Sequence, residues 1–69
     1  MADYRLKLYR RQHPKETPGT LIGNFTLAAD SAEEAILRAQ ADYADYLAEC
    51  DHAFIGGPHG RIVWELDRP

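Results

Sequence analysis

The stretch DSAEEAILRAQADYADYLAEC, residues 30–50, decides the fold because it is the clearest helix in the chain. Ser31 and Glu34 have the spacing of a capping box, in which the serine hydroxyl accepts from the N–H of Glu34 and the glutamate carboxylate accepts from the N–H of Ser31. Asp30 and Glu33 add negative charge where the helix dipole favours it. We therefore expect one helix of about 19 residues, roughly 28 Å long.

This predicted helix is amphipathic, because apolar residues recur at helical spacing along one face while polar residues occupy the other. The apolar face holds Ala32, Ala35, Ile36, Ala39, Tyr43, Tyr46, Leu47 and Cys50, and the polar face holds Arg38, Gln40, Asp42, Asp45 and Glu49. A helix of this kind buries its apolar face against another element, which the flanking sequence must supply.

Strands are predicted on both sides of the helix, where polar and apolar residues alternate with a period of two. The clearest are residues 3–11, 20–28 and 61–66. Residues 52–55 form a further short strand in one of two alternatives, pairing back across the glycine-rich turn at residues 56–60.

Glycine and proline mark the turns of the first hairpin. Pro18 and Gly19 fit the two central positions of a type II turn, in which glycine accepts a positive φ. Gly23 lies on the apolar side of the second strand, where it indicates a bulge or a close approach of the backbone. The alternative is that Gly23 and Asn24 form a two-residue turn between two very short strands.

These elements predict an α+β fold of one domain, residues 1–69, built as a two-layer sandwich. One amphipathic helix covers one face of an antiparallel or mixed sheet of three to four strands, in the order ββαβ or, with the extra strand, ββαββ. The expected core is Tyr4, Leu6, Leu8, Leu21, Phe25, Leu27, Ile36, Ala39, Tyr43, Leu47, Ile62, Trp64 and Leu66.

The composition is that of an ordinary globular protein, with 69 residues, 45% of them hydrophobic and 28% charged. The single cysteine excludes an intramolecular disulfide, and small secreted domains usually need several. The sequence contains neither an apolar signal-peptide core nor the roughly 20 apolar residues of a membrane span. We therefore expect a soluble, cytoplasmic protein without membrane partners.

The net charge of −3 hides an uneven distribution. Residues 1–15 contain five basic residues and one acidic residue, whereas residues 30–51 contain seven acidic residues and one basic residue. The first strand is therefore basic and the helix acidic, a pattern that points to interaction surfaces.

A single helix leaves one face of the sheet open. The expected members of that face are Arg5, Lys7, Tyr9, Ile22, Asn24, Thr26, Arg61, Val63 and Glu65. Such a face is either solvated or covered by a partner, and exposed edges are templates for pairing. Our leading hypothesis is a non-enzymatic protein-protein interaction or accessory module, most simply a homodimer or other homo-oligomer. Its predicted interaction surface is Arg5, Lys7, Tyr9, Arg10, Arg11 and Arg61.

A second hypothesis is nucleic-acid binding by the basic N-terminal hairpin. An electrostatic footprint with an interleaved aromatic residue is typical of such proteins. The residues concerned are Arg5, Lys7, Arg10, Arg11, His13 and Lys15, with Tyr9 among them. The sequence pI of about 5.4 and the acidic helix count against it.

A third hypothesis places a small ligand near His52 and the glycine-rich loop, at Gly56, Gly57 and His59. The loop offers backbone N–H groups, but it matches neither of the common phosphate-binding motifs and no helix follows it. A hairpin connection is the simpler interpretation.

Catalysis and metal binding have weak support. Cys50, His52 and His59 are the right residue types for a transition metal, but their spacing is poor for a structural zinc site. Cys50 falls on the apolar helix face, where we expect it to pack as a small hydrophobic residue. Asp42 and Asp45 lie on a solvated face, without the desolvated cleft that acid-base chemistry needs. No metal or cofactor is therefore predicted.

Overall fold

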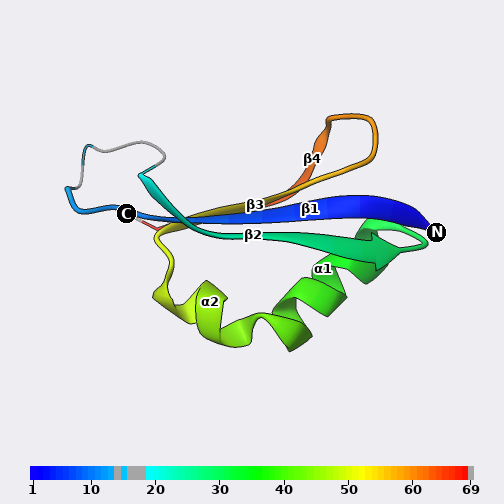
Figure 1. Cartoon of the computed structure of the whole chain (residues 1–69), viewed down its shortest axis with the longest axis horizontal. Helices are drawn as coiled ribbons and strands as arrows, with labels where there is room; N and C mark the ends of the chain where they lie inside the picture. The colour runs from blue at the N-terminus through cyan, green and yellow to red at the C-terminus, as the bar shows by residue number, and fades with distance from the viewer. Residues whose placement is uncertain (14, 16–18, 69) are drawn as a thin grey trace.

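The computed structural model describes residues 1–13, 15 and 19–68, whose four strands form one antiparallel sheet in the order β2-β1-β3-β4 (Figure 1). The elements are β1 (Ala2–Arg10), β2 (Thr20–Ala29), α1 (Ala32–Asp42), α2 (Ala44–Glu49), β3 (His52–Gly56) and β4 (Ile62–Asp67). The α+β sandwich is confirmed, together with the alternative in which residues 52–55 form a strand.

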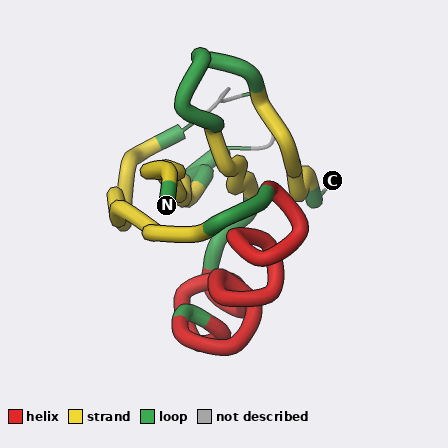
Figure 2. Tube along the Cα trace, turned by 90° about the vertical axis from the view of Figure 1, so that its right-hand side faces the viewer, coloured by secondary structure: helices red, strands yellow, loops and turns green. Residues whose placement is uncertain are grey.

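Both helices pack on the same face of the sheet and leave the other face open (Figure 1). Seen along the strands, the loop between β3 and β4 stands away from the sheet on the side opposite the helices (Figure 2). The open face is therefore bounded on one side by this hairpin loop. None of the helices in the described residues is long and apolar enough to cross a membrane.

The prediction of one uninterrupted helix is wrong, because the helical region breaks at Tyr43. The backbone of Tyr43 has φ −122° and ψ 30°, while its N–H still donates to the carbonyl of Ala39 at 3.0 Å. The bend brings two tyrosines against one strand residue: Phe25 stacks on Tyr43, with 4.3 Å between ring centroids, and meets Tyr46 edge-on at 5.0 Å. No glycine or proline marks this break, so only the packing reveals it.

The predicted cap of α1 forms with one change of partner. The hydroxyl of Ser31 accepts from the N–H of Glu34 at 3.1 Å, as expected. The carboxylate of Glu34 accepts from the N–H of Asp30 at 3.4 Å, rather than from that of Ser31. The helix thus begins where the capping box predicts.

The bulge predicted at Gly23 is confirmed, and the alternative of a two-residue turn there is wrong. β2 is continuous, but its register against β1 shifts between the Leu8–Gly23 pair and the Tyr9–Leu21 pair. Pro18 of the predicted type II turn lies outside the described residues. Gly19 has φ +107°, a conformation that favours glycine.

The core contains most of the predicted residues. Tyr4, Leu6, Leu8, Leu27, Ala39 and Leu47 are buried, and Phe25, Ile36, Tyr43, Trp64 and Leu66 pack partly buried against them. The strand β3 adds Ala53 and Ile55, both fully buried.

Two predicted core residues are exposed instead, Leu21 at 46% and Ile62 at 58%. Each lies beyond a register shift, so Leu21 pairs with Tyr9 and Ile62 pairs with Gly56. Because side chains alternate between faces, one extra residue moves the next side chain to the other side of the sheet.

Candidate binding surface on the open sheet face

The open face is built mainly by the two central strands, β1 and β3. Arg5, Lys7 and Tyr9 alternate along β1 with the buried leucines, so they point away from the helices. On β3, Phe54 lies opposite Lys7, and His52 lies opposite Tyr9. The register therefore places basic and aromatic side chains side by side at the centre of this face.

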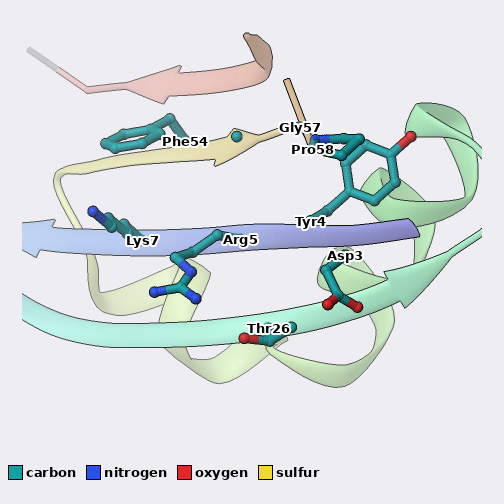
Figure 3. Close-up of a pocket in the computed structure, with 9 residues that line it drawn as sticks. Asp3, Tyr4, Arg5, Lys7, Thr26, Phe54, Gly57 and Pro58 are labelled. Atoms are coloured by element: carbon teal, nitrogen blue, oxygen red, sulfur yellow. The ribbon is translucent and has the colours of Figure 1, made fainter. Parts of the chain in front are cut away.

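A pocket of about 690 Å³ opens on this face, at the end of the sheet nearer the N-terminus. It is lined by Asp3, Tyr4, Arg5, Lys7, Thr26, Phe54, Gly56, Gly57 and Pro58. Figure 3 shows that the two basic side chains leave β1 in different directions: Arg5 points toward β2, which carries Thr26, and Lys7 points toward β3, which carries Phe54. A pocket of this volume falls in the range that accommodates small ligands.

The cations of the pocket have no intramolecular partner within the described part of the chain. Arg5 is exposed and Lys7 is half-buried, and neither forms an ion pair or a side-chain hydrogen bond there. Asp3 is the single acidic side chain among the residues that line the pocket. The pocket therefore presents an excess of positive charge.

An aromatic cluster extends the pocket along the face. The ring centroids of Tyr9 and Phe54 lie 6.0 Å apart, with the two planes only 19° from parallel. His52 contacts both rings, at 6.0 Å from Tyr9 and 6.1 Å from Phe54. Phe54 belongs to both the cluster and the pocket, and so connects them.

Arg11, a predicted interaction residue, is committed to contacts within the protein. Its side chain is only 12% exposed, pairs with the carboxylate of Asp67, and donates from Nη1 to the carbonyl oxygen of Arg68 at 2.6 Å. The hydrogen bond from Arg11, with a smaller contribution from His52, holds the pKa of Asp67 below its ordinary value. Arg11 therefore fastens β1 to the end of β4 and is not a free contact residue.

The other predicted contact residues remain accessible. Arg10 is exposed at the end of β1, and Arg61 is exposed in the loop that leads into β4. The N–H of Gly57 donates to the carbonyl oxygen of Arg61 at 2.6 Å, which keeps Arg61 beside the rim of the pocket. The backbone of Arg61 therefore lies next to Gly57, whereas Arg5 and Lys7 line the pocket itself.

The predicted ligand site at the histidines is only partly assembled. Gly56 and Gly57 line the pocket, but neither His52 nor His59 does. His52 instead lies at the far end of β3, within 3.6 Å of Glu65 and 3.5 Å of Asp67, whereas His59 is exposed in the turn.

Cys50 packs in the core as expected, with 1% of its surface exposed. Its thiol donates to the carbonyl oxygen of Leu47 at 3.4 Å. Burial raises the pKa of the Cys50 thiol, and the nearby charge of Arg68 offsets only part of this effect. A reactive thiolate is therefore disfavoured at this position.

Phe54 is the pocket-lining residue that the sequence did not predict. It falls in the short stretch whose strand character the sequence left open, so its face could not be assigned. Its aromatic side chain next to the glycine-rich loop was the available signal.

The two edges of the sheet differ in chemistry. β2 is an edge strand of 10 residues, TLIGNFTLAA, that contains neither a charged residue nor a proline. β4, at the other edge, has 6 residues and carries Glu65 and Asp67.

No family model, curated protein or solved structure matches this chain.

Proposed function

We propose that this protein is a small non-enzymatic interaction module that self-associates through the outer edge of β2. The observation that carries the proposal is the uncharged, proline-free edge strand of 10 residues. Such an edge offers a row of unpaired N–H and C=O groups to another strand.

The chemistry of β2 favours pairing over solvation. Monomeric proteins protect long edges with lysine, proline, bulges or short strands. β2 has one bulge, near its beginning, and from Gly23 to Ala29 its register is regular. By contrast, β4 is short and acidic, which matches a protected edge.

A symmetric arrangement satisfies this edge. Two β2 strands running antiparallel about a two-fold axis would present the same surface to each other, as closed dimers require. The sheets would join into one eight-stranded sheet with all helices on one side. A domain of this size buries only about 60% of its unfolded surface, so an added interface contributes a useful share of stability.

The mass in solution tests the proposal. Light scattering across a concentration series should give twice the chain mass of 7.8 kDa for the wild-type protein. The double variant Leu21→Lys/Ala28→Lys should be monomeric, because both residues are exposed and the added charges repel across the edge. Circular dichroism checks that the variant keeps its fold.

Ile62→Lys is the matched control on the other edge, where the wild-type side chain is 58% exposed. It should leave the dimer intact. A concentration-independent monomer mass for the wild-type protein overturns the proposal, and so does a dimer that Ile62→Lys dissociates while the β2 variant does not.

A further inference from the structure

We propose that the open sheet face binds single-stranded nucleic acid, with phosphate groups on Arg5 and Lys7 and a base against Phe54. The site uses residues of β1 and β3, whereas the proposed self-association uses the outer edge of β2. The two proposals are therefore independent.

The charge of the site suits a phosphate backbone. Arg5 and Lys7 lie on the same face of the sheet, and two residues of strand separate them by roughly 7 Å. Both lack an ion-pair partner among the described residues, so their charge is available to a ligand. Asp3 is the one acidic residue in the pocket lining. Glu65 pairs with Phe54 and lies on the same face outside the lining, 3.6 Å from His52.

The aromatic side chains supply the contacts for a base, in addition to the cations that suit the phosphates. Phe54 is half-buried, lines the pocket and lies nearly parallel to Tyr9 on the neighbouring strand. Bases stack on aromatic side chains whatever their sequence. A four-stranded sheet that presents aromatic residues from its strands is an established way of binding single-stranded RNA.

The shape of the face favours a single strand over a duplex. The loop between β3 and β4 stands away from the sheet on the side opposite the helices (Figure 2), and Gly57 and Pro58 of this loop line the pocket. A flexible single-stranded nucleic acid can follow the uneven surface formed by the sheet and this loop, and it can insert one unpaired base into the pocket. A duplex is rigid and keeps its bases stacked inside.

The acidic residues of the helices do not face the site. Glu33, Glu49 and the other helical carboxylates belong to elements on the opposite side of the sheet (Figure 1). At physiological ionic strength the Debye length is about 8 Å, so the salt in the solvent screens much of the repulsion from these exposed carboxylates. The net charge of −3 therefore weakens binding without preventing it.

An acidic peptide is the competing occupant, and it is distinguished by its lack of planar bases. It would use Arg5 and Lys7 but would gain little from stacking on Phe54. The presence of the aromatic cluster beside the cations therefore favours nucleic acid.

Fluorescence anisotropy with labelled oligo(U), oligo(dT), duplex DNA and polyglutamate tests the proposal over a series of KCl concentrations. Both single strands should bind more tightly than the duplex and the peptide. Stronger binding of oligo(U) identifies RNA as the ligand, and stronger binding of oligo(dT) identifies DNA.

Substitutions in the site separate the contribution of the cations from that of the aromatic ring. Arg5→Gln and Lys7→Gln should each weaken binding and lower the slope of log K against log salt by about 0.7, the value for one lost phosphate contact on a single strand. Phe54→Leu should weaken binding about fivefold or more without changing that slope.

Arg38→Gln is the matched control, because it removes one positive charge from α1 on the other side of the sheet. It should bind like the wild-type protein. The proposal is overturned if neither single strand binds, or if the duplex binds with equal affinity. It is also overturned if Arg38→Gln loses as much affinity as Arg5→Gln, or if Phe54→Leu binds with unchanged affinity.

The monomeric variant Leu21→Lys/Ala28→Lys separates this proposal from the proposed function. It should still bind short oligonucleotides, at least as tightly per chain as the wild-type protein, because Leu21 and Ala28 pair with Tyr9 and Asp3 and the added lysines therefore lie on the open face. If it binds while the wild-type protein is already monomeric, self-association fails and the nucleic-acid site stands. If the wild-type protein forms a dimer but binds neither single strand, the nucleic-acid site fails and self-association stands.

Discussion

Gly23 shows how a single residue sets the register of the first hairpin. A Cβ atom at this position would lie 2.8 Å from both Leu8 Cδ1 and Phe25 Cε2. Leu8 is fully buried and Phe25 is stacked on Tyr43, so neither can move freely. The absence of a side chain therefore lets β2 approach the core next to the bulge.

Gly23→Ala should destabilise the protein by about 1–2 kcal/mol, since overpacking a well-filled core costs about this much. The measurement is the free energy of unfolding in urea. Gly56→Ala is the control, because nothing lies within 4 Å of its added Cβ, and it should be neutral or slightly stabilising. Equal effects of the two variants would contradict the steric explanation.

Asp67 links the ends of β1, β3 and β4 through its contacts with Arg11 and His52. Its pKa lies below the ordinary value of 3.8, chiefly because of the hydrogen bond from Arg11. A carboxyl group with a lowered pKa in the folded state stabilises the protein above its unfolded pKa. This stabilisation is lost as the pH falls through the folded pKa.

Asp67→Asn should therefore be less stable than the wild-type protein above the ordinary carboxyl pKa of 3.8, and the difference should shrink as the pH falls below that value. Urea unfolding midpoints measured on both sides of this pH give the comparison. Asp42→Asn, which removes an exposed carboxyl on α1, is the control and should change the unfolding midpoint less than Asp67→Asn does. A gap for Asp67→Asn that persists at the lowest pH would contradict the assignment to its ionised carboxylate.

At the scale of elements, the short helix α2 depends on the C-terminal segment. Nη1 of Arg68 lies 2.9 Å from the carbonyl oxygen of Leu47 and 2.7 Å from that of Cys50. Its backbone N–H donates to the carbonyl of Asp51 at 2.8 Å. A cation at this position satisfies the last carbonyls of the helix and complements its dipole.

Arg68→Ala should lower the free energy of unfolding by roughly 1 kcal/mol and increase amide hydrogen exchange selectively at residues 44–50. Arg61→Ala is the control, because Arg61 is exposed and has no side-chain partner among the described residues. Unchanged exchange in α2 of Arg68→Ala would show that the arginine does not hold this helix.

At the scale of the whole molecule, the helices and the open face of the sheet differ in chemistry. The helices place acidic side chains on one side, and the open face gathers Arg5 and Lys7 with the aromatic cluster on the other. Self-association by stacking two open faces would cover Arg5, Lys7 and the aromatic cluster, whereas pairing of β2 edges leaves them exposed. Edge pairing also leaves the pocket accessible.

Thermal unfolding provides a test at this scale. If dimerisation stabilises the fold, the midpoint temperature of the wild-type protein should rise with protein concentration, because only the folded state binds its partner. Ile62→Lys should show the same rise, and Leu21→Lys/Ala28→Lys should show none. A midpoint that is independent of concentration in all three proteins would contradict folding coupled to self-association.

Local signals predicted the elements of this fold well. The capping box at Ser31 and Glu34 placed the beginning of α1, and the period-two alternation in residues 3–11 separated Leu6 and Leu8 from Arg5 and Lys7. These signals depend on residues close together in the sequence, so they can be recognised without the tertiary structure. The face assignments of Leu21 and Ile62 failed because each lies past a bulge, whose position is set by contacts between strands.

The sequence by itself determined the first two strands, the start of the helical region, the last strand, the buried face of β1 and the separation of basic and acidic segments, since each follows from local periodicity and composition. Tertiary structure alone decided the bend at Tyr43, the internal pairing of Arg11 and the joining of Phe54 to Arg5 and Lys7 in one pocket. These features need residues about 20 to 60 positions apart to meet. Their geometry is fixed by strand register and packing, which no single stretch of the chain contains.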